Sequence, residues 1–214
     1  MFPFFFRSAA AFALALLFVA PIAHGANRTI MVFGDSLSAA YGLAPSQGWV
    51  ALLANRAATA GLPWKVVNAS VSGETTSGGL SRLPVDLKRH KPDIVVIALG
   101  ANDALRGQPL AASRTNLEAM VRLARAAHAE PVLIGLMIPP NYGIEYAREF
   151  RDMYPGIAKK NGLKMVHFLL DGVADKREFF QNDQMHPTAA AQPIILDNVW
   201  PVLEPLLKRA APRP

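Results

Sequence analysis

Short runs of β-branched residues alternate with stretches of helical periodicity along almost the whole chain. The runs predict strands at residues 29–33, 65–68, 94–99, 132–138 and 164–169. The intervening stretches predict helices at residues 49–60, 82–90, 115–128 and 146–160, and a last helix that follows Pro187 toward Leu207. Because strands that alternate with helices form a parallel sheet whose two faces are both covered, this alternation excludes an all-β or an all-helical fold.

Two of the predicted strands are apolar from end to end. The segments at residues 93–100 and 131–138 read DIVVIALG and PVLIGLMI, as expected of parallel strands buried on both faces. With right-handed crossovers, the chain is predicted to be α/β: a three-layer α/β/α, doubly wound (flavodoxin-like) sheet of about five parallel strands. Pro84 is expected to start or kink its helix. No internal repeat or linker divides the 214 residues, which suit one domain.

The first 25 residues have the pattern of a secretory signal peptide. Arg7 precedes an apolar run at residues 9–20, and the small residues Ala23 and Gly25 follow Pro21. We therefore expect a signal peptide at residues 1–25, cleavage after Gly25 and a mature domain at residues 26–214. A membrane anchor is the alternative, but a spanning helix needs roughly 20 apolar residues. The protein is thus expected to be exported across the inner membrane, with the periplasm as its location.

The absence of cysteine and the net charge limit the kinds of binding site and partner that the chain can have. A chain without cysteine has no disulfide and no thiolate metal site, so its core must supply its stability. The formal net charge is +6, but the densest basic group, KRHK at residues 88–91, is typical of the solvated end of a helix. No nucleic-acid partner is expected. Transient contact with an anionic membrane surface stays open.

Polar residues follow the predicted strands at the edge where open α/β sheets bind ligands. The first strand ends in Gly34, Asp35 and Ser36, and Gly73 follows the second strand. The segment at residues 100–103 follows the third strand, and QNDQMHP at residues 181–187 precedes the last helix. Each pattern taken alone fits an ordinary turn or helix cap. Together they predict a cleft at one edge of the sheet.

A serine nucleophile needs a base and a group that orients the base. His90 and His128 lie near predicted helix ends, and His167 lies within a predicted strand, where a partly buried structural role is expected. His186 differs, because it lies in a loop three residues after Asp183 and could face Ser36. Ser36, Asp183 and His186 are therefore the candidate catalytic residues.

A tetrahedral intermediate also needs hydrogen-bond donors for its negative oxygen. The backbone N–H groups of Ser36 and Gly73 and the side-chain amide of Asn102 are the candidates for such an oxyanion hole. The alternative roles are a simple turn at Gly73 and a helix cap at Asn102.

Four sequence blocks together resemble those of the SGNH (GDSL) hydrolases. The blocks are GDSLS (34–38), NASVSGETTSGG (68–79), GAND (100–103) and DQMHP (183–187). Further segments, such as AEPVLIGLMIPPNYG, are similar to the periplasmic thioesterase I, lysophospholipase and arylesterase subgroup. Ala101 departs from the glycine that close relatives often have, which bears on local loop geometry alone. Ser38, where an α/β-hydrolase elbow has glycine, argues against that other fold.

The resemblance implies a serine esterase and thioesterase that works through an acyl-enzyme and needs no metal or cofactor. Ser36 would be the nucleophile, Asp183 and His186 its partners, and Gly73 and Asn102 oxyanion donors. The implied partners are small-molecule acyl esters or thioesters, including single-chain lipids, lysophospholipids and aryl esters, bound by a monomer. The alternatives are a carbohydrate O-deacetylase that uses the same blocks and a non-catalytic binding module.

Two loops are expected to shape the acyl site. They cover residues 103–110, after Asn102, and residues 139–145, after the fourth strand. We expect Asp103, Leu105, Pro140 and Tyr142 to contact substrate there.

Overall fold

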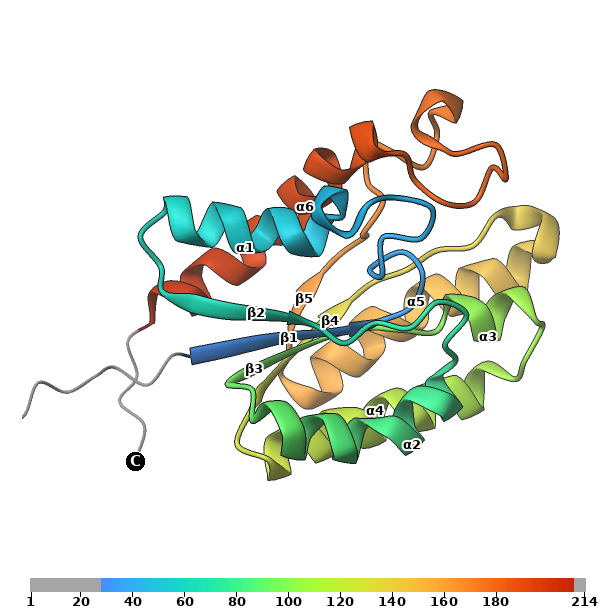
Figure 1. Ribbon diagram of the computed structural model, residues 1–214. Coiled ribbons are helices and arrows are strands. Elements are labelled where there is room, and N and C mark those ends of the chain that lie inside the picture. The colour runs from blue at the N-terminus through green and yellow to red at the C-terminus, as the bar shows by residue number, and fades with distance from the viewer. Residues whose placement is uncertain (1–27, 210–214) are drawn as a thin grey trace, which may run out of the picture.

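The structure is a computed structural model that describes residues 28–209, so the predicted signal peptide at residues 1–25 lies outside the described residues. Five strands form one sheet in the order β2-β1-β3-β4-β5 (Figure 1), and every neighbouring pair is parallel. The strands are β1 (Arg28–Gly34), β2 (Trp64–Asn68), β3 (Ile94–Ala98), β4 (Glu130–Ile134) and β5 (Lys164–Val166). The predicted five-stranded parallel sheet is thereby confirmed.

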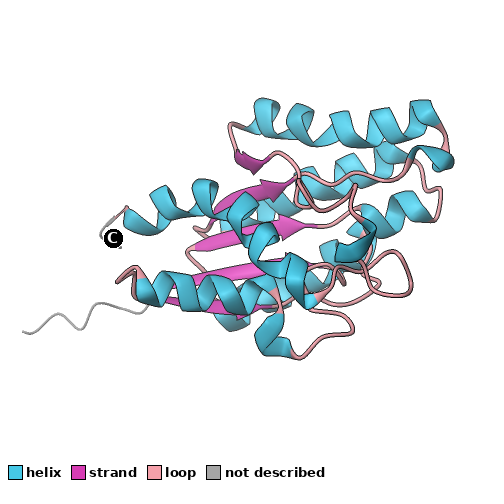
Figure 2. Ribbon diagram, turned by 90° about the horizontal axis from the view of Figure 1, so that it is seen from above, coloured by secondary structure: helices cyan, strands magenta, loops and turns pink. Residues whose placement is uncertain are grey.

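Helices cover both faces of the sheet, which confirms the three-layer architecture. On one face α1 (Trp49–Thr59) packs against α6 (Gln192–Lys208). On the other face lie α2 (Thr76–His90), α4 (Leu110–Ala126) and α5 (Ile144–Asn161) (Figures 1 and 2). The shorter helices are α3 (Ala101–Leu105), η1 (Pro45–Gln47), η2 (Pro140–Tyr142), η3 (Arg177–Phe179) and η4 (Ala189–Ala191).

The core sits on both sides of the central strands. Every residue of Ile94–Ala98 is buried, and Ile30 and Phe33 have no exposed surface. The edge strand β2 is only partly buried. The connection from β1 leads to β2 on one side of it, and the connection from β2 leads to β3 on the other side of β1, so the direction of winding reverses at β1. Such a switch point opens a crevice at the carboxyl ends of the strands.

The predicted fourth and fifth strands end earlier than expected. Gly135 donates its N–H to the carbonyl of Val166 at 2.8 Å and accepts the N–H of Leu169 at 3.0 Å, so the segments that follow β4 and β5 stay hydrogen-bonded just beyond the ladder. A Cβ on Gly135 would lie 2.1 Å from the carbonyl oxygen of His167, so this close approach requires glycine. His167 therefore lies one residue past β5 and is exposed, and its expected place within a strand is wrong.

Two helices begin earlier than their periodicity predicts. Helix α2 starts at Thr76, where the Oγ1 of Thr75 accepts the N–H of Gly78 at 3.2 Å as an N-cap. Pro84 lies inside this helix and does not start it. Helix α4 starts at Leu110, directly after Pro109. The expected solvated end at residues 88–91 is confirmed, because these residues form the last turn and the C-cap of α2.

Among residues 28–209, no helix has the length and apolar content that a membrane span requires.

Candidate active site

The nucleophile candidate lies in a tight turn directly after β1. A Cβ on Gly34 would lie 2.9 Å from the Oγ of Ser38 and 3.1 Å from the carbonyl oxygen of Ala98, so only glycine allows the strand to end this close to β3. The carbonyl of Asp35 then accepts the N–H of Ser38 at 3.1 Å. The turn leaves the half-buried Ser36 at the carboxyl edge of the sheet.

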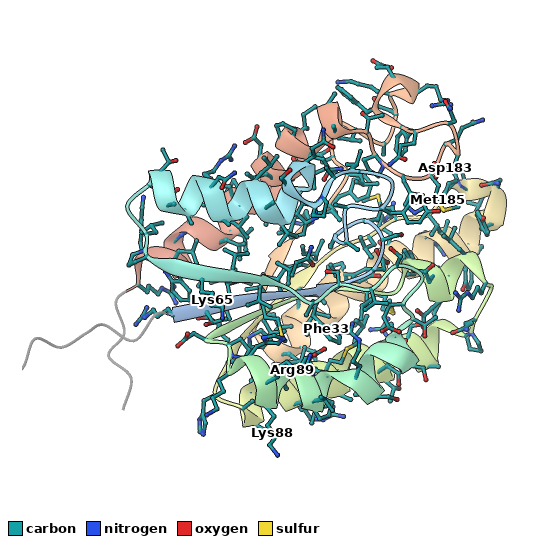
Figure 3. All side chains as sticks on the ribbon, in the orientation of Figure 1. Phe33, Lys65, Lys88, Arg89, Asp183 and Met185 are labelled. Carbon is teal, nitrogen blue, oxygen red and sulfur yellow. The ribbon has the colours of Figure 1, made fainter. Side chains whose placement is uncertain are left out.

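The histidine candidate reaches this serine from a loop between β5 and α6. The Nε2 of His186 lies 2.9 Å from the Oγ of Ser36, although 150 residues separate them. The Nδ1 of His186 lies 2.7 Å from the Oδ2 of Asp183. Figure 3 shows Asp183 and Met185 on this loop, at the opposite end of the molecule from Lys88 and Arg89. Because a carboxylate only accepts hydrogen bonds, Nδ1 carries the proton and Nε2 accepts from the serine hydroxyl.

Asp183 keeps its negative charge over the whole neutral range. Its Oδ1 accepts the backbone N–H groups of His186 and Met185, each at 3.0 Å. These two bonds and the bond from the imidazole lower the pKa of Asp183 from 3.8 to about 2. The loop thus presents a fixed anion that orients the imidazole through Nδ1.

The predicted oxyanion donors are two backbone N–H groups and one side-chain amide. The N–H groups of Ser36 and Gly73 find no acceptor within residues 28–209. Gly73 has φ +78, and its carbonyl accepts from Arg106 Nη2 at 3.2 Å. The Nδ2 of Asn102 donates to the carbonyl of Glu74 at 3.0 Å. Ser36, Gly73 and Asn102 all line one cavity.

Asp35 is a buried carboxyl beside these donors. Only 1% of Asp35 is exposed, and its Oδ1 accepts the N–H of Leu37 at 3.0 Å. The Nδ2 of Asn102 lies 3.4 Å from its Oδ2, a long contact. Burial raises the pKa of Asp35 from 3.8 to about 7, and the charge of Asp103 adds to the rise. Among the described residues, the second N–H of Asn102 is engaged only by this long contact with Asp35.

The expectation that Asp103 contacts substrate is wrong. Asp103 is 1% exposed and does not line the cavity. Its Oδ2 accepts the N–H of Thr76 at 2.8 Å, and its Oδ1 accepts the hydroxyls of Thr76 and Ser113. Asp103 therefore ties the first turn of α2 to α3 and α4. Residues 101–105 form a helix, which turns this side chain inward.

The cavity runs along the carboxyl ends of the strands and has a volume of about 880 Å³. The predicted residues Leu105, Pro140 and Tyr142 line it. Apolar residues that the sequence did not single out also line it: Met137, Ile138, Phe168, Leu170 and Phe180. Their place in the cavity could not be predicted, because residues 137, 138 and 168 belong to apolar runs that were predicted to be strands. A second hollow, near His128 and Leu87, contains none of the candidate site residues.

Comparison with known proteins gives consistent matches over most of the chain. The GDSL-like lipase/acylhydrolase family model matches residues 32–193. Esterase TesA of Pseudomonas aeruginosa is 50% identical over 182 residues, which are 85% of this chain and 90% of that protein. Thioesterase 1/protease 1/lysophospholipase L1 of Escherichia coli K12 is 40% identical over 187 residues, covering 85% of this chain and 86% of that protein.

One similar solved structure is the psychrotrophic esterase EstA of a Pseudoalteromonas species, inhibited by monoethylphosphonate. It superposes with a TM-score of 0.81 at 39% identity, covering 86% of this chain and 100% of EstA.

Proposed function

The chain belongs to the GDSL-like lipase/acylhydrolase family, and we propose that it hydrolyses esters and thioesters of single acyl chains with Ser36 as its nucleophile. The protein is a serine esterase, and relatives at 40–50% identity are named esterase TesA, arylesterase and thioesterase 1/protease 1/lysophospholipase L1. The observation that carries the residue assignment is the hydrogen-bonded series from Ser36 Oγ through His186 to Asp183, with distances of 2.9 and 2.7 Å. This series stands at the mouth of an apolar cleft.

In the acylation step, Nε2 of His186 takes the hydroxyl proton while Ser36 Oγ bonds to the carbonyl carbon. The carbonyl electron pair moves onto oxygen, which accepts hydrogen bonds from the N–H groups of Ser36 and Gly73 and from the amide of Asn102. The tetrahedral intermediate then collapses. The bond to the leaving oxygen or sulfur breaks, and the leaving group takes the proton from His186.

In the deacylation step, water replaces the leaving group. The neutral Nε2 of His186 takes a proton from the water while its oxygen attacks the acyl carbon, and the same three donors hold the second oxyanion. Collapse releases the carboxylic acid and returns the proton to Ser36 Oγ. Asp183 stays ionised throughout, since its pKa of about 2 lies far below neutral pH.

The shape of the cleft favours an acyl chain over a larger or more polar group. From Ser36, directly after β1, the lining residues extend past the ends of β3 and β4 to Phe168 and Leu170 after β5. Three strand spacings correspond to roughly 14 Å. Each buried CH₂ stabilises the bound chain by about 0.8 kcal/mol. We therefore propose single-chain lipids such as lysophospholipids, together with aryl esters, as substrates.

A panel of p-nitrophenyl esters from acetate to palmitate tests this substrate class. We expect kcat/KM to rise from acetyl to octanoyl or longer chains until the cleft is filled. A strict preference for acetyl would instead support the carbohydrate O-deacetylase alternative. The absence of turnover with every ester would support a non-catalytic binding module.

Labelling and substitution test the nucleophile. Ser36→Ala should abolish ester hydrolysis, and a phosphonate should bind covalently to Ser36 and to no other residue. Ser77→Ala is the matched control, because Ser77 is exposed on α2 outside the cleft. Full activity of Ser36→Ala, or labelling of another serine, contradicts the assignment.

We also propose that the protein is exported to the periplasm and acts as a monomer with transient membrane contact. The support is the pattern of residues 1–25, which lie outside the described residues, and the net charge, which is +6 for the full chain and +5 once Arg7 is removed with the signal peptide. Mass spectrometry of the protein from a cell fractionation should find Ala26 at its amino terminus. An uncleaved amino terminus in the cytoplasmic fraction would overturn the export.

A further inference from the structure

The two hydrogen bonds of His186 leave one motion of its ring unrestrained. They act at Nε2 and Nδ1, toward Ser36 and Asp183. Such a pair fixes the line that joins the two nitrogens, but the ring can still rotate about that line. This rotation turns the Nε2 lone pair away from the serine hydroxyl, so a contact on a face of the ring helps to hold the productive orientation.

Tyr41 supplies that contact. Its ring centroid lies 4.3 Å from the ring centroid of His186, with an angle of 36° between the ring planes. Half of Tyr41 is exposed, so its aromatic ring is not explained by core packing. An aromatic face also attracts a cation. The ring of Tyr41 therefore both supports the imidazole and favours the imidazolium that forms when His186 takes the proton.

Gln181 holds the loop that carries Tyr41 against the loop that carries His186. Its Nε2 donates to the carbonyl of Tyr41 at 2.8 Å and to the carbonyl of Pro187 at 3.0 Å. Its backbone N–H donates to the carbonyl of His186 at 2.8 Å. The two amide protons of Gln181 thus join the loop that follows Ser36 to the loop that contains His186.

The backbone at Gly42 is shaped to receive this glutamine. A Cβ on Gly42 would lie 2.2 Å from Gln181 Oε1, and Gly42 has φ +73, a conformation that favours glycine. Ala40 is also left-handed, with φ +59. The turn therefore adopts two uncommon conformations where it meets Gln181, which indicates that the approach of the two loops is specified by the sequence.

We propose that Tyr41 and Gln181 are positioning residues for the base: Tyr41 holds the face of the His186 ring, and Gln181 sets the spacing between the two loops. The proposal rests on the proposed roles of Ser36 and His186. Neither residue needs to touch the reacting atoms. Both act on the rate of proton transfer through the orientation of the imidazole.

Substitution of Tyr41 separates the ring from its hydroxyl. We expect Tyr41→Leu to lower kcat on p-nitrophenyl octanoate roughly 3- to 10-fold with KM changed less than about twofold, since the lost contact matters most once His186 is charged. Tyr41→Phe keeps the ring and should recover most of kcat. A wild-type kcat for Tyr41→Leu, or a rise in KM alone, overturns the proposal, because the latter would make Tyr41 a substrate contact.

A double-mutant cycle tests whether Tyr41 acts through His186. In a His186→Ala background, Tyr41→Leu should leave the residual rate unchanged, because the ring that Tyr41 supports is gone. The same fold loss in both backgrounds would mean a direct or general structural effect and would overturn the proposal. If Ser36→Ala and His186→Ala themselves retain activity, the proposed function fails instead.

Gln181→Met tests the spacing of the loops, because it keeps the length of the side chain and removes both N–H donors. We expect kcat to fall about 10-fold, as the loss of two net hydrogen bonds suggests, with a smaller change in KM. Asn182→Ala is the matched control, since the neighbouring Asn182 is exposed and its side chain makes no hydrogen bond within residues 28–209. Equal kcat values for Gln181→Met and Asn182→Ala contradict the role of Gln181.

Discussion

Replacing Asp35 by asparagine should make the protein more stable at alkaline pH, although Asp35 lies beside the proposed nucleophile. The carboxyl group is 1% exposed. It accepts one good hydrogen bond, from Leu37 N–H at 3.0 Å, and a long one from Asn102. An amide has almost the same shape and can accept the Leu37 bond, but it carries no charge. The substitution therefore removes the cost of burying a carboxylate.

The pKa of Asp35 sets the size of the effect. Burial, aided by the charge of Asp103, raises it from 3.8 to about 7. The difference between 3.8 and about 7 corresponds to about 4 kcal/mol, since each pKa unit is worth about 1.36 kcal/mol. This is a large part of the 5–15 kcal/mol that typically stabilises a domain.

The direction of the pH dependence follows from the raised pKa. Between pH 3.8 and about 7 the unfolded chain has lost the Asp35 proton while the folded protein holds it. The contribution of Asp35 to stability is therefore complete below pH 3.8 and is lost as the pH rises through 7. Asparagine does not titrate. The free energy of unfolding of Asp35→Asn minus that of the wild type should thus rise by up to about 4 kcal/mol from pH 4 to pH 8.

Urea unfolding of both proteins at pH 4, 6 and 8 measures this difference. Subtracting the wild-type value at each pH cancels the titration of groups that do not interact with Asp35. Subtracting the difference at pH 4 then cancels any constant cost of the amide. Asp152→Asn is the control, because Arg151 beside it lowers the pKa of this exposed carboxyl. Its stabilising contribution is present above pH 3.8 and is lost as the pH falls below that value, so its difference stays flat from pH 4 to 8. A flat or falling difference for Asp35→Asn would refute the reasoning.

Three further substitutions test the site and its support. Asn102→Ala should lower kcat in steady-state ester hydrolysis by about 10²–10³ with a smaller change in KM; a rise in KM alone would make Asn102 a binding residue. Asp103→Ala leaves the buried N–H and hydroxyl of Thr76 without an acceptor, so urea unfolding should show a loss of about 1–3 kcal/mol. An unchanged urea midpoint would contradict the stabilising role of the hydrogen bonds between Thr76 and Asp103. Gly135→Ala would place a Cβ 2.1 Å from the His167 carbonyl and should destabilise by about 1–3 kcal/mol; a wild-type melting temperature would contradict it.

The fold class and the order of the functional segments could be predicted from the amino-acid sequence. Apolar runs such as residues 94–98 can be stable only when buried on both faces, so they indicate a parallel sheet before any coordinate is known. In such a sheet every strand delivers its carboxyl end to one edge. This rule predicted that Ser36, Gly73, Asn102 and the Asp183–His186 segment would meet, and the structure brings them together around one cavity.

The beginnings of the helices were less accessible to sequence reasoning. The first residues of α2 read TSGG, which is a loop composition by local propensity. They are helical because Asp103 accepts both the N–H and the hydroxyl of Thr76. A residue 27 positions away thus decides where the helix starts. The same contact explains why Asp103 was assigned to the substrate in error, since its loop was expected to face the cleft.

The residues that surround His186 could not be predicted from the sequence and depend on the packing of the folded chain. Tyr41 and Gln181 carry no motif, and they lie 140 residues apart in the chain, yet a bond of 2.8 Å joins them. Local sequence reports backbone preference and the periodicity of burial, which act over a few residues. Contacts between loops depend instead on where packing of the whole sheet and its helices places each strand end. For that reason the motifs predicted the reacting groups, whereas the side chains that hold them in place became visible only in the folded chain.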